Sequence, residues 1–240
     1  MKKAYFNWST GKDSSLALYY MLQEKEFNIA KLVTTVNKDY ERVSMHGLRE
    51  ALLDAQVERL QLPLQKIYFP AEVSMSSYDA TMKNATQKLV AENFTHGIFG
   101  DIFLEDLRSY REKKLQEVGI TGVFPLWKKD TKTLLKEFIH LGFKAITVCV
   151  NANLLDKSFV GRIIDEDFIN DLPDTVDPCG ENGEFHTFVF DGPLFSSPIE
   201  FAIGEKVLKT YTSSEKDEDT CGTDDSAWDT AFWYCDLLPK

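Results

Sequence analysis

The sequence predicts an α/β protein, in which a parallel sheet covered by helices on both faces is followed along the chain by a smaller α+β domain. In the first half, β-rich runs alternate with amphipathic runs of helical spacing. After about residue 125 this alternation loosens, and residues 177–193 carry Gly and Pro, with an alternation through Phe185, Thr187 and Val189. We therefore expect two domains, residues 1–125 and 126–240.

Each expected strand of the alternating part of the chain is followed by an expected helix. Apolar residues recur at intervals of two along the strands and of three and four along the helices. The strands are residues 2–8, 29–37, 64–70, 95–102 and 122–127, and the helices are 14–23, 46–62, 77–93, 105–119 and 131–141. Ligands bind at the carboxyl ends of such parallel strands, so the segments that follow them should converge there.

The second half contains fewer regular elements. Residues 143–152 read as one more strand, and residues 177–193 as a hairpin with an Asn-Gly turn. Residues 213–226 hold six acidic residues against one Lys, which predicts a mobile loop. Residues 227–238 are apolar enough to return to the core.

Composition restricts the class of protein. The chain has 240 residues, of which 43% are hydrophobic, and a net charge of −11. This charge argues against broad binding of nucleic acid phosphates. No apolar run approaches the ~20 residues of a membrane span or forms a signal peptide, so we expect a cytoplasmic protein without a membrane partner. The oligomeric state is open, with a homodimer as one option.

The four cysteines, Cys149, Cys179, Cys221 and Cys235, form no CxxC pair. We interpret them as reduced thiols. A metal cluster of Cys179, His186, Cys221 and Cys235 is the alternative.

The chemistry of the chain is first visible in "STGKDS", residues 9–14, hereafter the phosphate loop. It is not a Walker A loop, because Phe6 stands at the position of the first Gly and Asp13 follows Lys12. Gly11 and its small neighbours would let backbone N–H groups approach phosphate at a helix N-terminus. Asp13 beside phosphate requires a cation, and Mg²⁺ accepts carboxylate and phosphate oxygens together. The loop predicts a magnesium–nucleotide site, although a capped helix start explains the spacing equally well.

"STGKDS" resembles the SGGKDS loop of the PP-loop ATP pyrophosphatases, the Rossmann-like adenine nucleotide alpha-hydrolase superfamily. Nearly the whole chain resembles the diphthine–ammonia ligase family within it. The shared segments are "GDIFLEDLRSYRE" (100–112), "FPLW" (124–127) and "DPCGENGEFHTFVFDGP" (177–193). "WSTGKDS" and "MHGLR" (45–49) are more similar to the bacterial branch of the family.

The resemblance implies a ligase that uses ATP and Mg²⁺ to adenylate a carboxylate, which ammonia then attacks, releasing AMP and pyrophosphate. The carboxylate is borne by a small molecule or a protein, and free ammonium is the expected nitrogen source. The residues implied as catalytic are Lys12, Asp13, Asp101, Glu181, Glu184 and His186. Those implied to bind ATP are Trp8, Ser9, Thr10, Gly11, Lys12, Asp13, Ser14, Val36, His46 and Gly100. Those implied to bind substrate are Arg108, Arg111, Cys179, Gly180 and Asn182, and Asp13 and Asp101 would hold Mg²⁺ through the phosphates.

Several of these residues have structural alternatives. Arg108 and Arg111 suit an anionic substrate or a salt-bridged helix face. The carboxylates of residues 181 and 184, with His186, could deprotonate ammonium or stabilise a tight hairpin. No activating base is evident beside Cys179, which favours a buried thiol over a nucleophile.

Thr10 is the one departure from the family loop, because it stands where the first Gly is usual. A β-branched residue is costly at positive φ. We therefore expect an ordinary φ at Thr10, with its hydroxyl offered to a phosphate.

Two functions from other classes remain alternatives. One is a PP-loop enzyme that modifies tRNA, against which the net charge and the absence of CxxC argue. The other is a non-catalytic ATP-binding sensor, against which the retained Lys12, Asp13 and "GENGEFH" argue.

Overall fold

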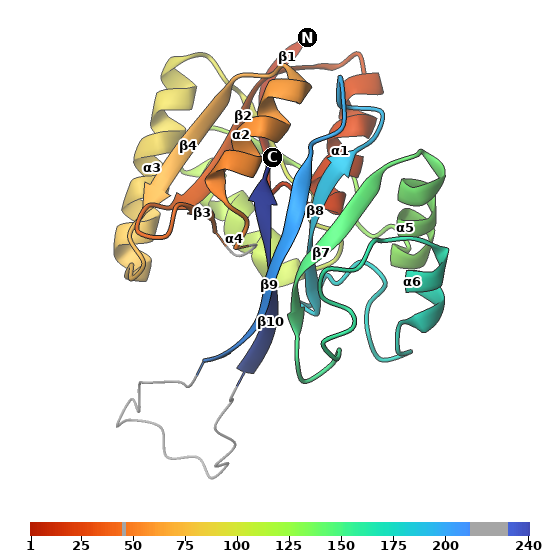
Figure 1. Ribbon diagram of the computed structural model, residues 1–240. Coiled ribbons are helices and arrows are strands. Elements are labelled where there is room, and N and C mark those ends of the chain that lie inside the picture. The colour runs from red at the N-terminus through yellow and green to blue at the C-terminus, as the bar shows by residue number, and fades with distance from the viewer. Residues whose placement is uncertain (45–46, 212–229) are drawn as a thin grey trace.

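Two sheets form the framework of the protein (Figure 1). The structure is a computed structural model that describes residues 1–44, 47–211 and 230–240. The predicted acidic loop at 213–226, Cys221 and His46 lie outside the described residues. Among the helices that are described, none has the length and apolar content needed to cross a bilayer.

The first sheet is almost entirely parallel, which confirms the predicted α/β class. Its strand order is β3-β2-β1-β5-β6, with β4 also paired to β2, and only β3 runs antiparallel. The strands are β1 (Lys2–Asn7), β2 (Phe27–Asn37), β3 (Arg42–Val43), β4 (Leu64–Phe69), β5 (His96–Ile98) and β6 (Thr121–Val123). The carboxyl ends of β1, β2 and β5 therefore meet at one edge.

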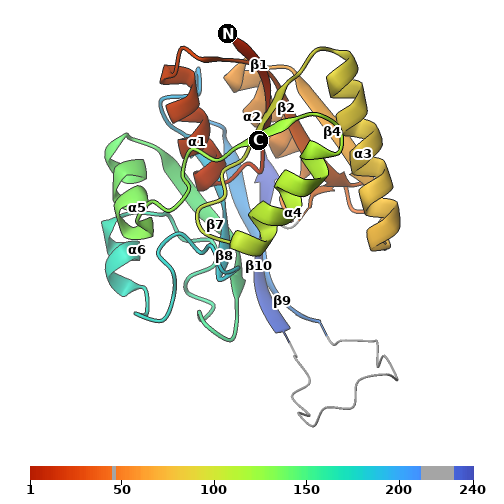
Figure 2. The same cartoon turned by 180° about the vertical axis from the view of Figure 1, so that it is seen from behind.

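Helices cover both faces of this sheet (Figure 2). They are α1 (Lys12–Gln23), α2 (Glu50–Leu60), α3 (Met75–Ala91) and α4 (Glu105–Gln116). Side chains alternate along a strand, so Ala4 and Phe6 of β1 join the buried cluster of α1 and α2, whereas Tyr5 joins the cluster beneath α3 and α4. The two faces thus have separate cores.

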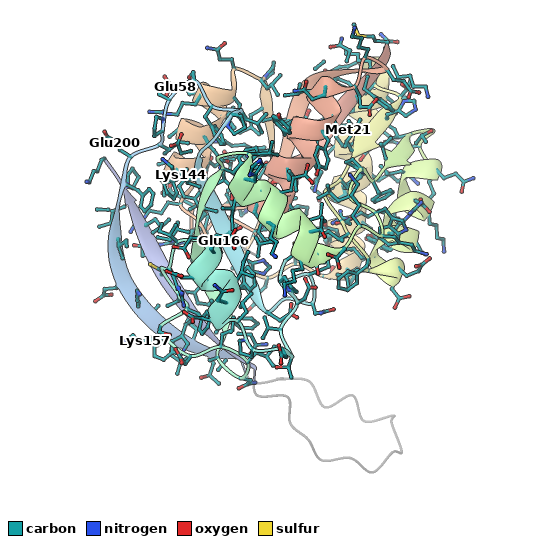
Figure 3. The ribbon with its side chains drawn as sticks, turned by 90° about the vertical axis from the view of Figure 1, so that its right-hand side faces the viewer. Met21, Glu58, Lys144, Lys157, Glu166 and Glu200 are labelled. Atoms are coloured by element: carbon teal, nitrogen blue, oxygen red, sulfur yellow. The ribbon has the colours of Figure 1, made fainter. Side chains whose placement is uncertain are left out.

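The second sheet is antiparallel, in the order β8-β7-β10-β9. Its elements are α5 (Thr131–His140), β7 (Lys144–Asn151), α6 (Glu166–Asp171), β8 (Phe185–Asp191), β9 (Phe201–Tyr211) and β10 (Thr230–Pro239). Phe138, Val148 and Phe188 belong to the same buried cluster as Phe6, so the core of α1 and α2 continues into this sheet. Figure 3 shows the protein with its side chains, and Lys144 of β7 and Glu166 of α6 are labelled.

Several elements differ from the sequence prediction. The strand expected at 122–127 ends at Val123, because residues 124–127 form a turn in which Trp127 N–H donates to the Phe124 carbonyl (3.1 Å) and Pro125 has no N–H to donate to a ladder. The helix expected from residue 46 begins at Glu50. The strand β9 was not predicted.

Candidate active site

Most of the predicted site residues line one cavity of about 690 Å³. Its wall is built from the phosphate loop, the carboxyl ends of β2 and β5, the first turns of α4, and residues 179–187. The predicted residues on this wall are Trp8, Ser9, Gly11, Lys12, Asp13, Ser14, Gly100, Asp101, Arg111, Cys179, Gly180, Glu181, Asn182 and His186. Segments more than 150 residues apart in sequence therefore contribute to one site. Lys12 and Glu181, for example, line the same cavity.

The phosphate loop leads directly into α1, which begins at Lys12. The Gly11 carbonyl accepts hydrogen bonds from the hydroxyls of Ser14 (2.9 Å) and Ser15 (3.0 Å). The first N–H groups of a helix have no acceptor within it and can bind an anion. A Cβ on Gly100 would lie 3.1 Å from the backbone of Asp13 and Ser14, so glycine permits the end of β5 to approach the loop this closely. The local geometry suits a phosphate.

Thr10 contradicts the expectation of an ordinary φ, because its φ is +74°. Its side chain is fully buried and does not line the cavity. Among the described residues, no atom forms a hydrogen bond with Thr10 Oγ1. The expected φ is therefore wrong, and the buried hydroxyl does not face the cavity in which a phosphate would bind. The loop needs the left-handed conformation at this position, and Thr10 adopts it in spite of its branched Cβ.

Gln56 of α2 supports the loop from behind, and the sequence analysis missed it. Its side-chain amide accepts a hydrogen bond from Trp8 Nε1 (2.7 Å) and donates to the carbonyls of Thr10 (3.1 Å) and Val189 (2.7 Å). It is completely buried. A signal was available, because Gln56 follows Leu52 and Leu53 at helical spacing on the apolar face of α2.

Lys12 joins the phosphate loop to the segment of residues 177–187. Its ammonium group donates to both carboxylate oxygens of Asp13 (2.9 and 2.8 Å) and to the Cys179 carbonyl, and its backbone N–H donates to Thr187 Oγ1 (3.1 Å). Burial lowers the pKa of Lys12, but the carboxylates around it, led by Asp13, raise it above its ordinary value. The buried ammonium is therefore positively charged.

Asp101 and Arg111 form an ion pair at the edge of the cavity, with Arg111 Nε 2.9 Å from Asp101 Oδ2. Burial raises the pKa of Asp101, and Arg111 opposes this shift. Arg108 does not line the cavity. Its guanidinium lies over the rings of Phe124 and Trp127 and pairs with Glu112 (2.9 Å), which matches the salt-bridged alternative.

Magnesium fits this site only together with phosphate oxygens. Among the described residues, no group of three His, Cys, Asp or Glu side chains could hold a metal ion, so the alternative metal cluster has no counterpart there. Asp13 and Asp101 line the same cavity but already face Lys12 and Arg111. Mg²⁺ is commonly held by one or two carboxylates plus substrate phosphates, and this pair of carboxylates matches that pattern.

Glu181 and His186 face the cavity with shifted pKa values. Burial raises the pKa of Glu181 to about 7, although its Oε1 accepts hydrogen bonds from the backbone N–H groups of Ile102 (2.7 Å) and Phe103 (3.3 Å). Burial, reinforced by Lys12, lowers the pKa of His186 to about 4. At neutral pH, Glu181 is thus close to its midpoint and His186 is uncharged.

Glu184 lies behind the cavity wall. Its buried carboxylate accepts from the N–H of Asp177 (3.0 Å), the N–H of Asn182 (2.9 Å) and Asn182 Nδ2 (3.0 Å), which matches the hairpin alternative rather than catalysis. The Cys179 thiol donates to the Thr131 carbonyl (3.3 Å), and burial raises its pKa well above the ordinary value. It is therefore a poor nucleophile.

Val36 also lies away from the cavity. Its side chain is completely buried in the core of α1 and α2, so it offers no surface to a ligand there.

Comparisons with known proteins identify the family of this chain. Residues 1–122 match the diphthamide synthase N-terminal domain, and residues 130–216 match the diphthamide synthase C-terminal domain. The chain belongs to the diphthamide synthase family. The resemblance to diphthine–ammonia ligases that the sequence motifs indicate is thereby confirmed.

Its relatives include three proteins named diphthine–ammonia ligase. The protein of Schizosaccharomyces pombe is 28% identical over 56% of this chain and 24% of its own length. The human protein is 31% identical over 50% and 48%, and that of Danio rerio is 35% identical over 49% and 48%. This chain thus spans about half or less of the length of these relatives. Among solved structures, that of a predicted subunit of tRNA methyltransferase from Methanocaldococcus jannaschii aligns with a TM-score of 0.41 and 15% identity, over 60% of this chain and 77% of that one. This likeness is too weak to inform function.

Proposed function

We propose that this chain is an ATP-dependent ligase that converts a carboxylate into an amide with ammonia and forms AMP and pyrophosphate. Membership of the diphthamide synthase family supports this reaction class. The observation that carries the proposal is the single cavity lined both by the phosphate loop and by residues 179–187. Such a ligase must hold the nucleotide and the acyl group together, because the carboxylate oxygen attacks the α-phosphate and ammonia then attacks the carbon that bears this oxygen.

The chemistry explains why both parts are needed. Ammonia does not displace oxide from a carboxylate, so the carboxylate oxygen must first become a good leaving group. Its attack on the α-phosphate of ATP forms a mixed anhydride with AMP and releases pyrophosphate. Ammonia then attacks the acyl carbon and AMP departs. The acyl carrier, whether a small molecule or a protein, is part of the proposal that the site leaves open.

The residues of the cavity suit separate parts of this reaction. The phosphate loop and Lys12 would bind the triphosphate, and Asp13 and Asp101 would hold the Mg²⁺ that it carries, which supplies positive charge against the phosphates. Glu181 would accept a proton from ammonium. A carboxylate whose pKa is about 7 is well matched to that task at neutral pH.

The test is calorimetric titration with Mg²⁺ and an ATP analogue methylene-bridged between the α- and β-phosphates. We expect micromolar binding that falls by more than about tenfold, or about 1.4 kcal/mol, in Asp13→Ala. Glu58→Ala is the control, because the Glu58 side chain is 81% exposed on α2, away from the cavity. Thermal melts of each variant verify folding.

Failure of the wild type to bind the analogue, or equal binding by Asp13→Ala, would remove the basis of the proposal. With binding established, a panel of carboxylates is screened with ammonium for AMP and pyrophosphate. A complete lack of turnover across small-molecule and peptide-borne carboxylates would count against the ligase reaction.

A further inference from the structure

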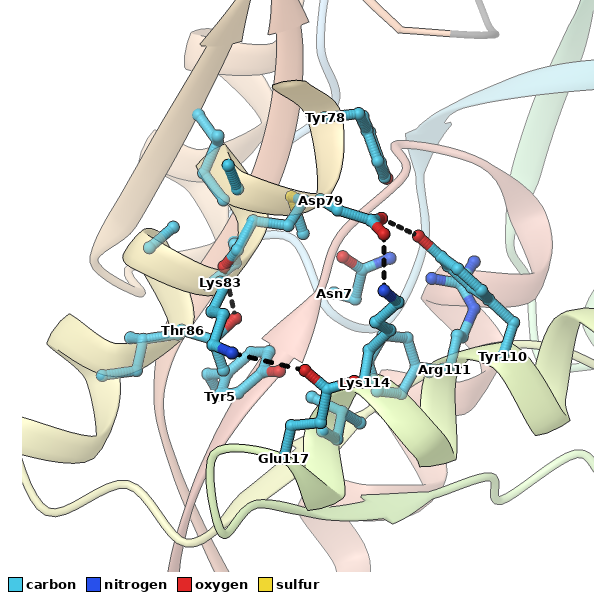
Figure 4. A pocket seen from close by; sticks show the side chains of 18 residues that line it. Tyr5, Asn7, Tyr78, Asp79, Lys83, Thr86, Tyr110, Arg111, Lys114 and Glu117 are labelled. Atoms are coloured by element: carbon cyan, nitrogen blue, oxygen red, sulfur yellow. Dashed lines mark hydrogen bonds and ion pairs between the residues drawn. The ribbon is translucent and has the colours of Figure 1, made fainter. Parts of the chain in front are cut away.

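A second cavity, of about 290 Å³, lies between α3 and α4 on the opposite face of the sheet from α1 (Figure 4). Its apolar lining includes Val33 of β2, Leu89 of α3 and the ring of Phe99. None of the reaction steps assigned above uses it. Its volume is at the lower end of the roughly 300–1,000 Å³ of ligand pockets, so it suits a small ligand.

The cavity exists because α4 contributes little apolar surface. Of the residues of α4, Leu115 alone is buried, so the helix does not fill the space above the sheet. Polar bridges join α3 to α4 instead. Lys114 pairs with Asp79 (2.5 Å), Tyr110 donates a hydrogen bond to Asp79, and Lys83 pairs with Glu117 (3.4 Å) (Figure 4). The cavity thus has an apolar floor on the sheet and a rim of charged side chains from α3 and α4.

This cavity adjoins the candidate active site. Four side chains, those of Asn7, Tyr78, Met82 and Arg111, line both cavities. Arg111 is central among them, because its guanidinium lies over the Phe99 ring (4.8 Å from the centroid) and its Nε contacts Asp101. Arg carries five N–H donors in a planar fork that matches a carboxylate. Arg111 can therefore contact an anion at the junction while its Nε faces Asp101.

Each cation of the rim already faces a carboxylate. The cationic side chains that line the α3–α4 cavity are Lys83, Arg111 and Lys114, and the acidic ones are Asp79 and Glu117. With Asp101, which pairs with Arg111, three carboxylates face the three cations, so the rim carries no excess charge. A ligand with an apolar body and one carboxylate matches the floor and the N–H donors of Arg111 other than Nε.

We propose that the α3–α4 cavity binds the apolar body of the acyl substrate, and that Arg111 receives its carboxylate beside the phosphate loop. This proposal rests on the ligase function proposed above. It assigns the substrate to small monocarboxylates with an aromatic or branched aliphatic body. The reacting carboxylate would then lie at the junction of the two cavities, next to the cavity in which the ATP phosphates are proposed to bind.

The test uses phenylacetate, 3-phenylpropanoate and 4-methylpentanoate as probes, in the presence of Mg²⁺ and the methylene-bridged ATP analogue. Binding is measured by saturation-transfer NMR titration. Ala85→Phe places a ring in the cavity from α3, and Ala91→Phe is the matched control, because Ala91 is exposed on the same helix and does not line the cavity. We expect at least one probe to bind the wild type and Ala91→Phe alike, and at least tenfold more weakly to Ala85→Phe.

Arg111→Gln provides a second test that does not depend on the folding of Ala85→Phe. It should weaken phenylacetate at least tenfold and leave the binding of neutral phenylacetamide unchanged. If no probe binds the wild type, or if Ala85→Phe or Arg111→Gln binds phenylacetate as tightly as the wild type, the assignment of this cavity is wrong. Analogue binding is measured on the same samples. If the wild type binds the ATP analogue but not the probes, only the assignment of the α3–α4 cavity is wrong. If the wild type does not bind the analogue, the proposed ligase function is itself overturned.

Discussion

Replacement of Thr10 by glycine should stabilise this protein, although glycine usually destabilises. A non-glycine residue in the left-handed region costs about 1–3 kcal/mol, and Thr10 has a φ of +74°. Its buried hydroxyl lacks a hydrogen-bond partner among the described residues, which costs about another 1–3 kcal/mol. Both costs are absent in Thr10→Gly.

Two losses oppose this gain. The two carbon atoms removed beyond Cα give up about 1.5 kcal/mol of apolar burial at ~0.8 kcal/mol each. Glycine also increases the conformational entropy of the unfolded chain, at about 0.5–1 kcal/mol. The net effect is a rise of about 1–2 kcal/mol in the free energy of unfolding. For a chain of this size, that raises Tm by roughly 2–4 °C per kcal/mol.

The assay is urea unfolding followed by far-UV circular dichroism, with Thr10→Ala as the intermediate step. Alanine removes the hydroxyl but keeps a Cβ at positive φ, so it should give only part of the gain. Thr121→Gly is the control, because Thr121 is exposed in β6 and its φ is not positive. It should lose about 0.5–1 kcal/mol. A Thr10→Gly variant less stable than the wild type would refute the reasoning.

Two further changes test the surroundings of the loop. Gln56→Leu leaves Trp8 Nε1 without its buried acceptor and removes the side-chain donor from the carbonyls of Thr10 and Val189, of which Thr10 keeps its bond from Val189 N–H. Urea unfolding should show a loss of about 2–4 kcal/mol. A loss below about 1 kcal/mol would contradict the support assigned to Gln56. For Glu181, the folded pKa of about 7 exceeds the ordinary 4.5, so the folded state binds the proton more tightly than the unfolded chain. The free energy of unfolding of the wild type should therefore fall relative to Glu181→Gln as the pH rises from about 4.5 to about 7, and pH-independent difference values would show that the carboxyl is not buried as described.

Most of the first sheet was predictable because its parallel strands alternate along the chain with amphipathic helices, whereas the two-residue strand β3 was not predicted. The edge strand β9 was not, because Gly204 interrupts its alternation and the residues that follow it mix exposed Val207 and Leu208 with lysines. An edge strand needs no continuous apolar face, so its pattern carries less information. Helix α1 begins two residues earlier than expected, because Gly11 has an extended backbone that lets Lys12 start the helix.

Within the site, the sequence predicted which segments meet but not which side chains face the cavity. Glu181 and Glu184 are both carboxylates of "GENGEF", yet only Glu181 lines the cavity. Gly180 and Gly183 both adopt positive φ, at +68° and +85°. These turns abolish the strand period that would assign alternate residues to opposite faces. The direction of each carboxylate then depends on tertiary hydrogen bonds, which the sequence pattern does not contain.

The phosphate loop lies in the first half of the chain, but the second half holds it in shape. The Thr10 carbonyl accepts a hydrogen bond from Val189 N–H of β8 (3.0 Å) as well as from Gln56, and Thr187 of β8 accepts from Lys12 N–H. Each contact fixes a backbone group beside the strained residue. A left-handed threonine persists only where its surroundings over-determine the conformation. The antiparallel sheet therefore acts directly on the candidate active site, by stabilising a conformation that the phosphate loop alone would not maintain.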